Sequence, residues 1–222
     1  MSPIGIFGGT FDPIHYGHLR SAFELLQALE LDHVRFVPSA DPPHRGSTFA
    51  PAELRYRMVE VAVAGQAGFV VDDCEFRREG PSYTIDTLAA MRAEHGDRSL
   101  CLITGMDAYL GLTSWHRWDE ILNIAHIIVA HRPGWQLPAS GALGDLLAAH
   151  GTYDVADLHT KSHGCIFHHE VTQLEIASTE IRELIAAGRD PRFLMPDSVR
   201  DIIVESGCYT GEVDLINAEN NA

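Results

Sequence analysis

Two histidines three positions apart, in the stretch His15-Tyr16-Gly17-His18, stand between an apolar run and a segment with helical spacing. This position predicts that both imidazoles lie at the N-terminus of a helix. Imidazole N–H groups there, supported by the positive end of the helix dipole, could donate hydrogen bonds to phosphate oxygens. Such a pair could stabilise the charge that builds up when a phosphorus atom is attacked, and Gly17 would let a nucleotide lie close to the backbone.

Two glycines, Gly8 and Gly9, precede the histidines and are expected directly after the first strand. A backbone without Cβ can turn sharply there and let a phosphate approach the amides at the start of the helix. The spacing matches neither the GxGxxG pattern of dinucleotide-binding dehydrogenases nor the GxxxxGK[ST] pattern of P-loop kinases, so both classes lose their main support. Asp12-Pro13, between the glycines and the histidines, is typical of a turn.

Hydroxyl groups and an arginine recur near the other end of the sequence, in Ile176-Ala177-Ser178-Thr179-Glu180-Ile181-Arg182. Ser178 and Thr179 precede a helical pattern, so one of them is expected to cap that helix. The freed amides could then hold a β- or γ-phosphate, with Arg182 forming a charge-assisted pair. The alternative is an ordinary capped helix with a surface arginine.

Short apolar runs alternate with helical patterns along the sequence, which predicts a doubly wound α/β fold with a mainly parallel sheet and helices on both faces. Ligands of such folds bind at the carboxyl ends of the strands. Strands are expected at residues 3–8, 33–38, 69–71, 99–103, 126–130 and 165–168. Helices are expected at residues 19–29, 52–64, 84–94, 117–123, 140–150, 179–187 and 197–206. We expect one domain at residues 1–210, with a small C-terminal helical part at about 178–208, followed by a polar tail at residues 211–222.

Composition argues against several kinds of partner. The 222 residues carry a formal net charge of −15, which would repel nucleic acid and anionic membranes. No stretch approaches the ~18 unbroken apolar residues of a membrane span, and residues 1–9 do not resemble a signal peptide. Four cysteines without a CxxC pair favour a reduced, cytoplasmic protein: Cys74, Cys101, Cys165 and Cys208. The oligomeric state stays open.

A cluster of His163, Cys165, His168 and His169 is the one group that suggests a metal. Side chains of a strand alternate between its two faces, so Cys165 and His169 would share one face while His168 points to the other. No second pair elsewhere in the sequence completes a tetrahedral site, so we expect no protein-bound zinc.

The two end motifs resemble the nucleotidyltransferase superfamily that carries HxGH near its N-terminus and an ISxTxIR-like element near its C-terminus. Five further segments resemble one family of it, the bacterial nicotinate mononucleotide adenylyltransferases: PPHR (42–45), PSYTIDTL (81–88), GMDAY (105–109), SWHRW (114–118) and HRPG (131–134). The similarity runs in order from about residue 4 to about residue 209. Ala177 departs from the pattern, because some relatives carry a serine there.

This resemblance implies a Rossmann-like fold and adenylyl transfer. The phosphate of nicotinate mononucleotide would attack the α-phosphorus of ATP, giving nicotinate adenine dinucleotide and pyrophosphate in NAD biosynthesis, with Mg²⁺ arriving on ATP. The nucleophile needs no protein base, because the second pKa of a phosphate monoester is about 6. The alternatives are phosphopantetheine adenylyltransferase or another nucleotidyltransferase of small substrates, and a non-catalytic nucleotide sensor.

The resemblance also implies a role for individual residues. The catalytic residues would be His15, His18 and Arg182. The ATP site would consist of Gly8, Gly9, Thr10, Phe11, Gly17, Ser178, Thr179 and Arg182. The nicotinate mononucleotide site would consist of His44, Arg45, Ser82, Tyr83, Thr84, Gly105, Asp107, Trp115, His116 and Arg132.

Each member of the second site also has a structural alternative. His44 and Arg45 would meet the mononucleotide phosphate, or else be solvated loop charges. Thr84 and nearby amides would face the nicotinate carboxylate and reject the amide form, although helix capping alone explains this segment. Asp107 would bind a ribose hydroxyl and Trp115 would stack on the pyridine ring, or else serve as a helix-start aspartate and a core tryptophan. Arg132 would support the phosphates.

Overall fold

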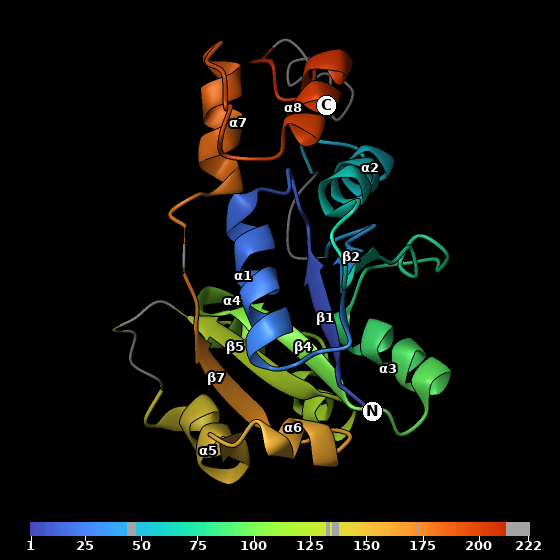
Figure 1. Cartoon of the computed structure of the whole chain (residues 1–222), viewed down its shortest axis with the longest axis vertical. Coiled ribbons are helices and arrows are strands. Elements are labelled where there is room, and N and C mark those ends of the chain that lie inside the picture. Colours follow the sequence, from blue (N-terminus) through green and yellow to red (C-terminus); the bar gives the residue numbers. More distant parts are fainter. Residues whose placement is uncertain (44–47, 132–133, 135–137, 173, 212–222) are drawn as a thin grey trace.

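Parallel strands form the centre of the computed structural model, which describes residues 1–43, 48–131, 134, 138–172 and 174–211 (Figure 1). Within these residues seven strands pair in the order β3-β2-β1-β4-β5-β7-β6, every pair parallel. Their bounds are β1 Ile4–Gly9, β2 His33–Pro38, β3 Phe69–Val71, β4 Leu100–Gly105, β5 His126–His131, β6 Gly151–Thr152 and β7 Ile166–Glu170.

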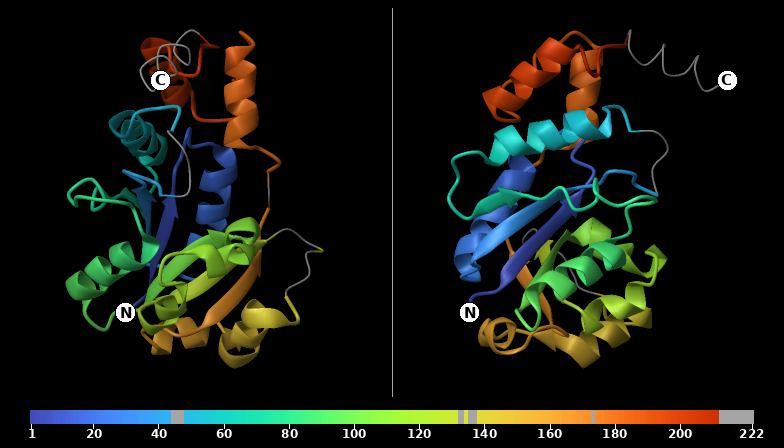
Figure 2. Two further views of the ribbon diagram at one scale, coloured as in Figure 1. Left: turned by 180° about the vertical axis from the view of Figure 1, so that it is seen from behind. Right: turned by 90° about the vertical axis from the view of Figure 1, so that its right-hand side faces the viewer.

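Apolar side chains alternate between the two faces of the sheet and form a core on each. In β4, for example, Leu100 and Leu102 belong to one core, and Cys101 and Ile103 belong to the other. Both faces are therefore covered by helices, and Figures 1 and 2 show α1 and α3 on opposite sides of β1. The predicted doubly wound, Rossmann-like α/β fold is confirmed.

Helices lie between successive strands and follow the last one. Their bounds are α1 Tyr16–Ala28, α2 Ala52–Val63, α3 Thr84–His95, α4 Met106–Leu110, α5 Gly141–His150, α6 Ala156–Thr160, α7 Ser178–Ala186 and α8 Asp197–Ser206, with 3₁₀ turns η1 Leu112–Ser114 and η2 Trp118–Asn123. Helices α1 and α2 pack on the core that contains Cys101, and α3 and α4 pack on the core that contains Leu100. No helix in the described part of the chain is long and apolar enough to cross a membrane.

Three local predictions are wrong. Helix α1 begins at Tyr16 rather than residue 19, because the His15 carbonyl already accepts helical hydrogen bonds although residues 16–18 carry no apolar pattern. Gly8 and Gly9 do not follow β1 but end it, paired with β2. The helix predicted at 117–123 is the 3₁₀ turn η2, and the short elements α4, η1, β6 and α6 were not predicted, because so few residues give no detectable period.

The order of the strands places a crevice between β1 and β4. The chain moves outward from β1 through β2 to β3, and then returns to the other side of β1 to form β4. Connections therefore leave the carboxyl ends of β1 and β4 in opposite directions, which opens a space where α/β folds bind ligands. Gly9 ends β1 and Gly105 ends β4, so both lie at this switch point.

Helices α7 and α8 pack above this end of the sheet. Figure 1 shows α7 above the start of α1 and α8 above α2, and Figure 2 shows the same stacking from two other sides. Hydrogen bonds hold the contact: for example, Tyr16 N–H donates to the Leu194 carbonyl at 3.0 Å, and Ser178 Oγ donates to the Pro13 carbonyl at 3.0 Å. The C-terminal helices are thereby attached to the turn between β1 and α1.

Acid should destabilise the fold through His126, a fully buried residue of β5. Its Nδ1 accepts from Cys165 N–H and its Nε2 donates to the Lys161 carbonyl, and burial lowers its pKa from 6.5 to about 4. The unfolded chain takes up this proton below pH 6.5 and the folded chain does not, so the free energy of unfolding falls by up to about 1.4 kcal/mol per pH unit until about pH 4.

Urea unfolding of wild type and His126→Gln at several pH values in this window measures that contribution. The variant should be less stable at neutral pH, because the glutamine does not match both backbone partners, and its stability should decline less steeply with acid. Equal slopes for the two proteins would contradict the assignment.

Candidate active site

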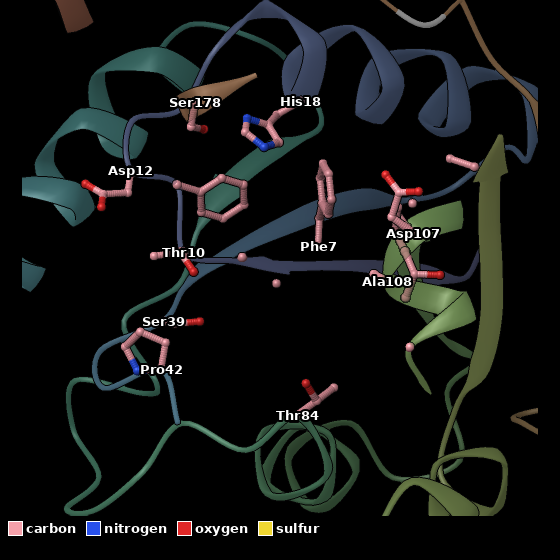
Figure 3. A pocket seen from close by; sticks show the side chains of 18 of the residues that line it. Phe7, Thr10, Asp12, His18, Ser39, Pro42, Thr84, Asp107, Ala108 and Ser178 are labelled. Atoms are coloured by element: carbon pink, nitrogen blue, oxygen red, sulfur yellow. The ribbon is translucent and has the colours of Figure 1, made fainter. Parts of the chain in front are cut away.

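A cavity of about 770 Å³ opens at the switch point between β1 and β4, within the size range of small-molecule sites. Figure 3 shows Phe7, Thr10 and His18 along one side of the open space, Asp107 and Ala108 at another, and Thr84 across from His18. Segments far apart in the sequence thus meet around one space.

Most of the predicted site residues line this cavity. They are Gly8, Gly9, Thr10, Phe11, His15, Gly17, His18, Ser82, Tyr83, Thr84, Gly105, Asp107, Trp115, His116, Ser178 and Thr179. Arg182 is not in the wall. His44, Arg45 and Arg132 lie outside the described residues.

The two histidine rings stack on each other with their centroids 3.7 Å apart. His15 N–H donates to Nδ1 of His18 at 3.3 Å, so a neutral His18 carries its proton on Nε2. Burial lowers the pKa of His15 to about 4, and burial together with the adjacent His15 lowers the pKa of His18 well below its ordinary value. Both imidazoles are therefore neutral at pH 7, and each can donate one N–H without burying a charge.

Aromatic contacts fix the orientation of His18. The Phe11 ring meets it edge-on at 5.1 Å between centroids, and the Phe7 ring does so at 6.1 Å. Phe11 adopts a left-handed backbone with φ of 48°, and its ring fills the space where a Cβ at position 9 would lie, 3.1 Å away. A side chain at position 9 would therefore push the Phe11 ring by a few tenths of an ångström, and this ring supports His18.

The prediction that Ser178 or Thr179 caps α7 is wrong. The N-cap is Ala177, and it makes no side-chain capping bond. Ser178 is the first helical residue, and its hydroxyl donates to the Pro13 carbonyl in the β1–α1 turn instead. Its sequence position suggested a cap, but its neighbour in space decides its hydrogen bond.

Ser82, Tyr83 and Thr84 likewise do not cap α3 with a side chain; Tyr83 occupies the N-cap position without such a bond. The Ser82 hydroxyl accepts from Asp41 N–H at 3.0 Å, and Ser82 N–H donates to the Asp41 carbonyl at 2.8 Å. This reciprocal pair joins the loop after β2 to the start of α3. Capping therefore does not account for the segment, and its hydrogen bonds shape the cavity wall.

Arg182 lies behind Thr179, which does line the cavity. Its Nη2 donates to Thr179 Oγ1 at 3.2 Å, and its Nη1 donates to the Asp12 carbonyl at 2.7 Å. The guanidinium also lies over the Phe49 ring, 4.3 Å from the centroid. The structure thus brings Arg182 of the second motif next to the turn between β1 and α1. It contacts Thr179 of the cavity wall but does not itself line the cavity.

The region around Trp115 forms another part of the wall. Trp115 is half-buried and packs against the core beneath α3, and the exposed His116 ring tilts against Tyr83 at 4.3 Å between centroids. Arg117 reaches Asp86 of α3 at 3.5 Å. These contacts attach the segment after α4 to the start of α3.

Two charged residues of the site were missed from sequence. Glu75 lines the cavity and accepts from the Thr87 hydroxyl at 2.7 Å, a contact across twelve positions that no local pattern indicates. Arg55 is fully buried and donates to main-chain carbonyls around the cavity. A signal for Arg55 was available, because it shares a helical face with Met58 and Val59, and a lone arginine in an apolar stripe indicates a buried charge.

A parallel sheet with a cavity at its switch point, lined by imidazoles at a helix N-terminus, defines a nucleotide-binding α/β protein. The chain belongs to the cytidylyltransferase-like family, whose model matches residues 6–184. The resemblance seen in the sequence is confirmed.

Individual relatives cover nearly the whole chain. A "Probable nicotinate-nucleotide adenylyltransferase" of Aeromonas hydrophila is 50% identical over 93% of this chain and 97% of its own length. The protein of the same name in Halorhodospira halophila is 45% identical over 94% of this chain and 96% of its own. Among solved structures, Plasmodium falciparum nicotinic acid mononucleotide adenylyltransferase complexed with NaAD has a TM-score of 0.70 at 17% identity, covering 94% of this chain and 98% of its own, and so shares the fold.

The substitution Gly17→Ala should weaken nucleotide binding without lowering the stability of α1. A Cβ at position 17 would lie 2.9 Å from Nδ1 of His15, so the stacked imidazole must move. Alanine is favoured over glycine in a helix by about 1 kcal/mol, so the thermal midpoint should stay the same or rise. Affinity for a nucleoside triphosphate, measured by calorimetry, should nevertheless fall about tenfold because an N–H donor is displaced. Unchanged affinity would contradict the placement of His15.

Proposed function

We propose that this protein transfers the adenylyl group of ATP to nicotinate mononucleotide, forming nicotinate adenine dinucleotide and pyrophosphate in NAD biosynthesis. The observation that carries the proposal is that His15 and His18 share one cavity with Ser178 and Thr179, about 160 positions later in the sequence. The names of relatives that match almost the full chain support the same reaction.

The chemistry needs alignment and charge stabilisation more than it needs a base. The phosphate of nicotinate mononucleotide is already anionic, since its second pKa is about 6, and one of its oxygens forms the new bond to the α-phosphorus. The bond between that phosphorus and the β-phosphate oxygen breaks, and pyrophosphate leaves with the electron pair. The proton on Nε2 of His18 is placed to donate to an α-phosphate oxygen as charge accumulates there, and His15 stacks beside it.

The triphosphate is assigned to the space between the two motifs. Thr10 lines this space together with Ser178 and Thr179, the first residues of α7, and the free amides of a helix start bind phosphate. Arg182 supplies positive charge from behind Thr179, whose hydroxyl it contacts at the cavity wall, and this charge favours binding of the β- and γ-phosphates.

Magnesium enters the proposal together with ATP. The Asp12 carboxylate already accepts from two backbone N–H groups, and the described residues contain no group of three or more His, Cys, Asp and Glu arranged to hold a metal ion. Phosphate oxygens and water suit Mg²⁺ as ligands, and the ion would neutralise part of the triphosphate charge.

Nicotinate mononucleotide is assigned to the wall formed by Ser82, Tyr83, Thr84, Trp115 and His116. The first amides of α3 have no partner within the helix and carry the positive end of its dipole, so they can bind the nicotinate carboxylate. A carboxamide would bring its NH₂ group against these donors, which disfavours the amide nucleotide.

The other substrate contacts remain predictions from the resemblance. Gly105 and Asp107 lie at the end of β4, where a ribose hydroxyl would meet the exposed carboxylate. His44, Arg45 and Arg132 keep their predicted roles toward the substrate phosphates.

The deciding experiment compares three acceptors. Purified protein is incubated with ATP and Mg²⁺ plus nicotinate mononucleotide, nicotinamide mononucleotide or phosphopantetheine, and pyrophosphate release is measured. The first should react fastest. Preference for either of the others would overturn the substrate assignment, and no release with any of them would favour a nucleotide sensor.

His18→Ala should lower turnover at least 100-fold, because it removes a preorganised donor to the reacting phosphate. His33→Ala is the matched control: this histidine pairs with Asp32 at the opposite end of the sheet and should leave turnover unchanged. Circular dichroism shows whether both variants are folded. Near-normal turnover by folded His18→Ala would refute the role of this imidazole.

A further inference from the structure

The carboxylate of Asp12 connects three separate parts of the chain. The residue is 4% exposed, and Figure 3 shows its side chain directed away from the open space of the cavity. Oδ2 accepts from Phe49 N–H at 2.9 Å, and Oδ1 accepts from Ala50 N–H at 3.1 Å and from the Tyr209 hydroxyl at 2.7 Å. A turn residue of the first motif is thus bound to the loop before α2 and to the residue that follows α8 and its turn.

The Tyr209 side chain is built into this position. It is 2% exposed, and burial and the nearby Asp12 carboxylate raise the pKa of its phenol, so the hydroxyl stays protonated and donates. Among the described residues, Tyr209 is the only side chain that donates to the Asp12 carboxylate, since the other two donors are backbone amides. Removing its hydroxyl leaves a buried carboxylate oxygen with a single donor, which costs more than an ordinary hydrogen bond.

Besides the Thr179 hydroxyl, Arg182 has two supports, and both depend on Asp12. The first is the Asp12 carbonyl, which accepts from Nη1. The second is the Phe49 ring beneath the guanidinium, whose backbone N–H is bound by the Asp12 carboxylate. A shift of Asp12 would therefore move the two groups that hold Arg182 beside Thr179.

We infer that Tyr209 is a positioning residue for Arg182, acting through Asp12 to keep the guanidinium aimed at the triphosphate. The inference rests on the proposed role of Arg182 toward ATP. Tyr209 itself touches no substrate: it is outside the cavity wall, and it acts by fixing the turn that carries Arg182.

The fold should tolerate loss of the Tyr209 hydroxyl because Arg55 secures the same loops independently. Its guanidinium donates to the carbonyls of Thr10 at 2.7 Å, Ala50 at 3.2 Å and Ala40 at 3.3 Å. Tyr209→Phe therefore removes one hydrogen bond while the surrounding backbone stays attached.

The test is a double-mutant cycle in the full chain with Tyr209→Phe, Arg182→Gln and the double variant. Turnover is followed with ATP labelled at the α-phosphorus, which is sensitive enough for slow variants, at a temperature well below each unfolding midpoint. Tyr209→Phe should lower kcat/KM for ATP about tenfold in wild type, and less than about twofold when Arg182 is already glutamine. Its KM for nicotinate mononucleotide should stay unchanged. Tyr109→Phe is the matched control, a buried tyrosine whose hydroxyl has no hydrogen-bond partner among the described residues, and it should behave as wild type.

Two results would overturn the inference: full activity of Tyr209→Phe, or the same fold-loss in both backgrounds. The second result would mean that Tyr209 acts on overall structure. Failure of the proposed role of Arg182 is distinguishable, because Arg182→Gln alone would then turn over at the wild-type rate.

Discussion

A fully buried arginine constrains the loops around the cavity. The guanidinium of Arg55 has left water, so its N–H groups must find acceptors inside the protein. They find the main-chain carbonyls of Thr10, Ala40 and Ala50, which belong to two loops that leave neighbouring strands. Burial lowers the pKa of Arg55, and the charge of Asp12 counters that effect. The cost of an unpaired buried charge thus fixes the backbone on which the site is built.

The site addresses an electrostatic problem that the composition creates. A chain of net charge −15 must attract two phosphorylated substrates. Among the described residues, however, no arginine or lysine lines the cavity. The first residues of helices and two neutral histidines line the space instead, and donors of this kind need no buried positive charge to attract an anion. Arg182 stays behind the wall, where a carbonyl, a hydroxyl and an aromatic ring hold it.

Sequence reasoning found the sheet because every central strand is a short apolar run between helical patterns. It placed His15 and His18 correctly at the start of a helix, since they stand between the glycines that follow the first apolar run and the helical period that begins at Leu19. The predicted helix caps were wrong because these side chains bind residues distant in the sequence. Ser178 binds Pro13 and Ser82 binds Asp41, and neither caps its own helix. The apolar helical face around Arg55 indicated a buried charge, but its acceptors are main-chain carbonyls, which sequence does not distinguish.

The attachment of α7 and Tyr209 to the turn after β1 has a consequence for how the protein is made. A ribosome completes the seven strands of the described residues by residue 170, before it has synthesised Ser178, Arg182 or Tyr209. The nascent chain at that point still lacks the residues that α7 and Tyr209 bring to the turn after β1, together with the side chains that α7 and α8 add to the core on that face of the sheet. A prematurely terminated product would therefore lack both part of this core and the groups that the last helices contribute to the proposed site.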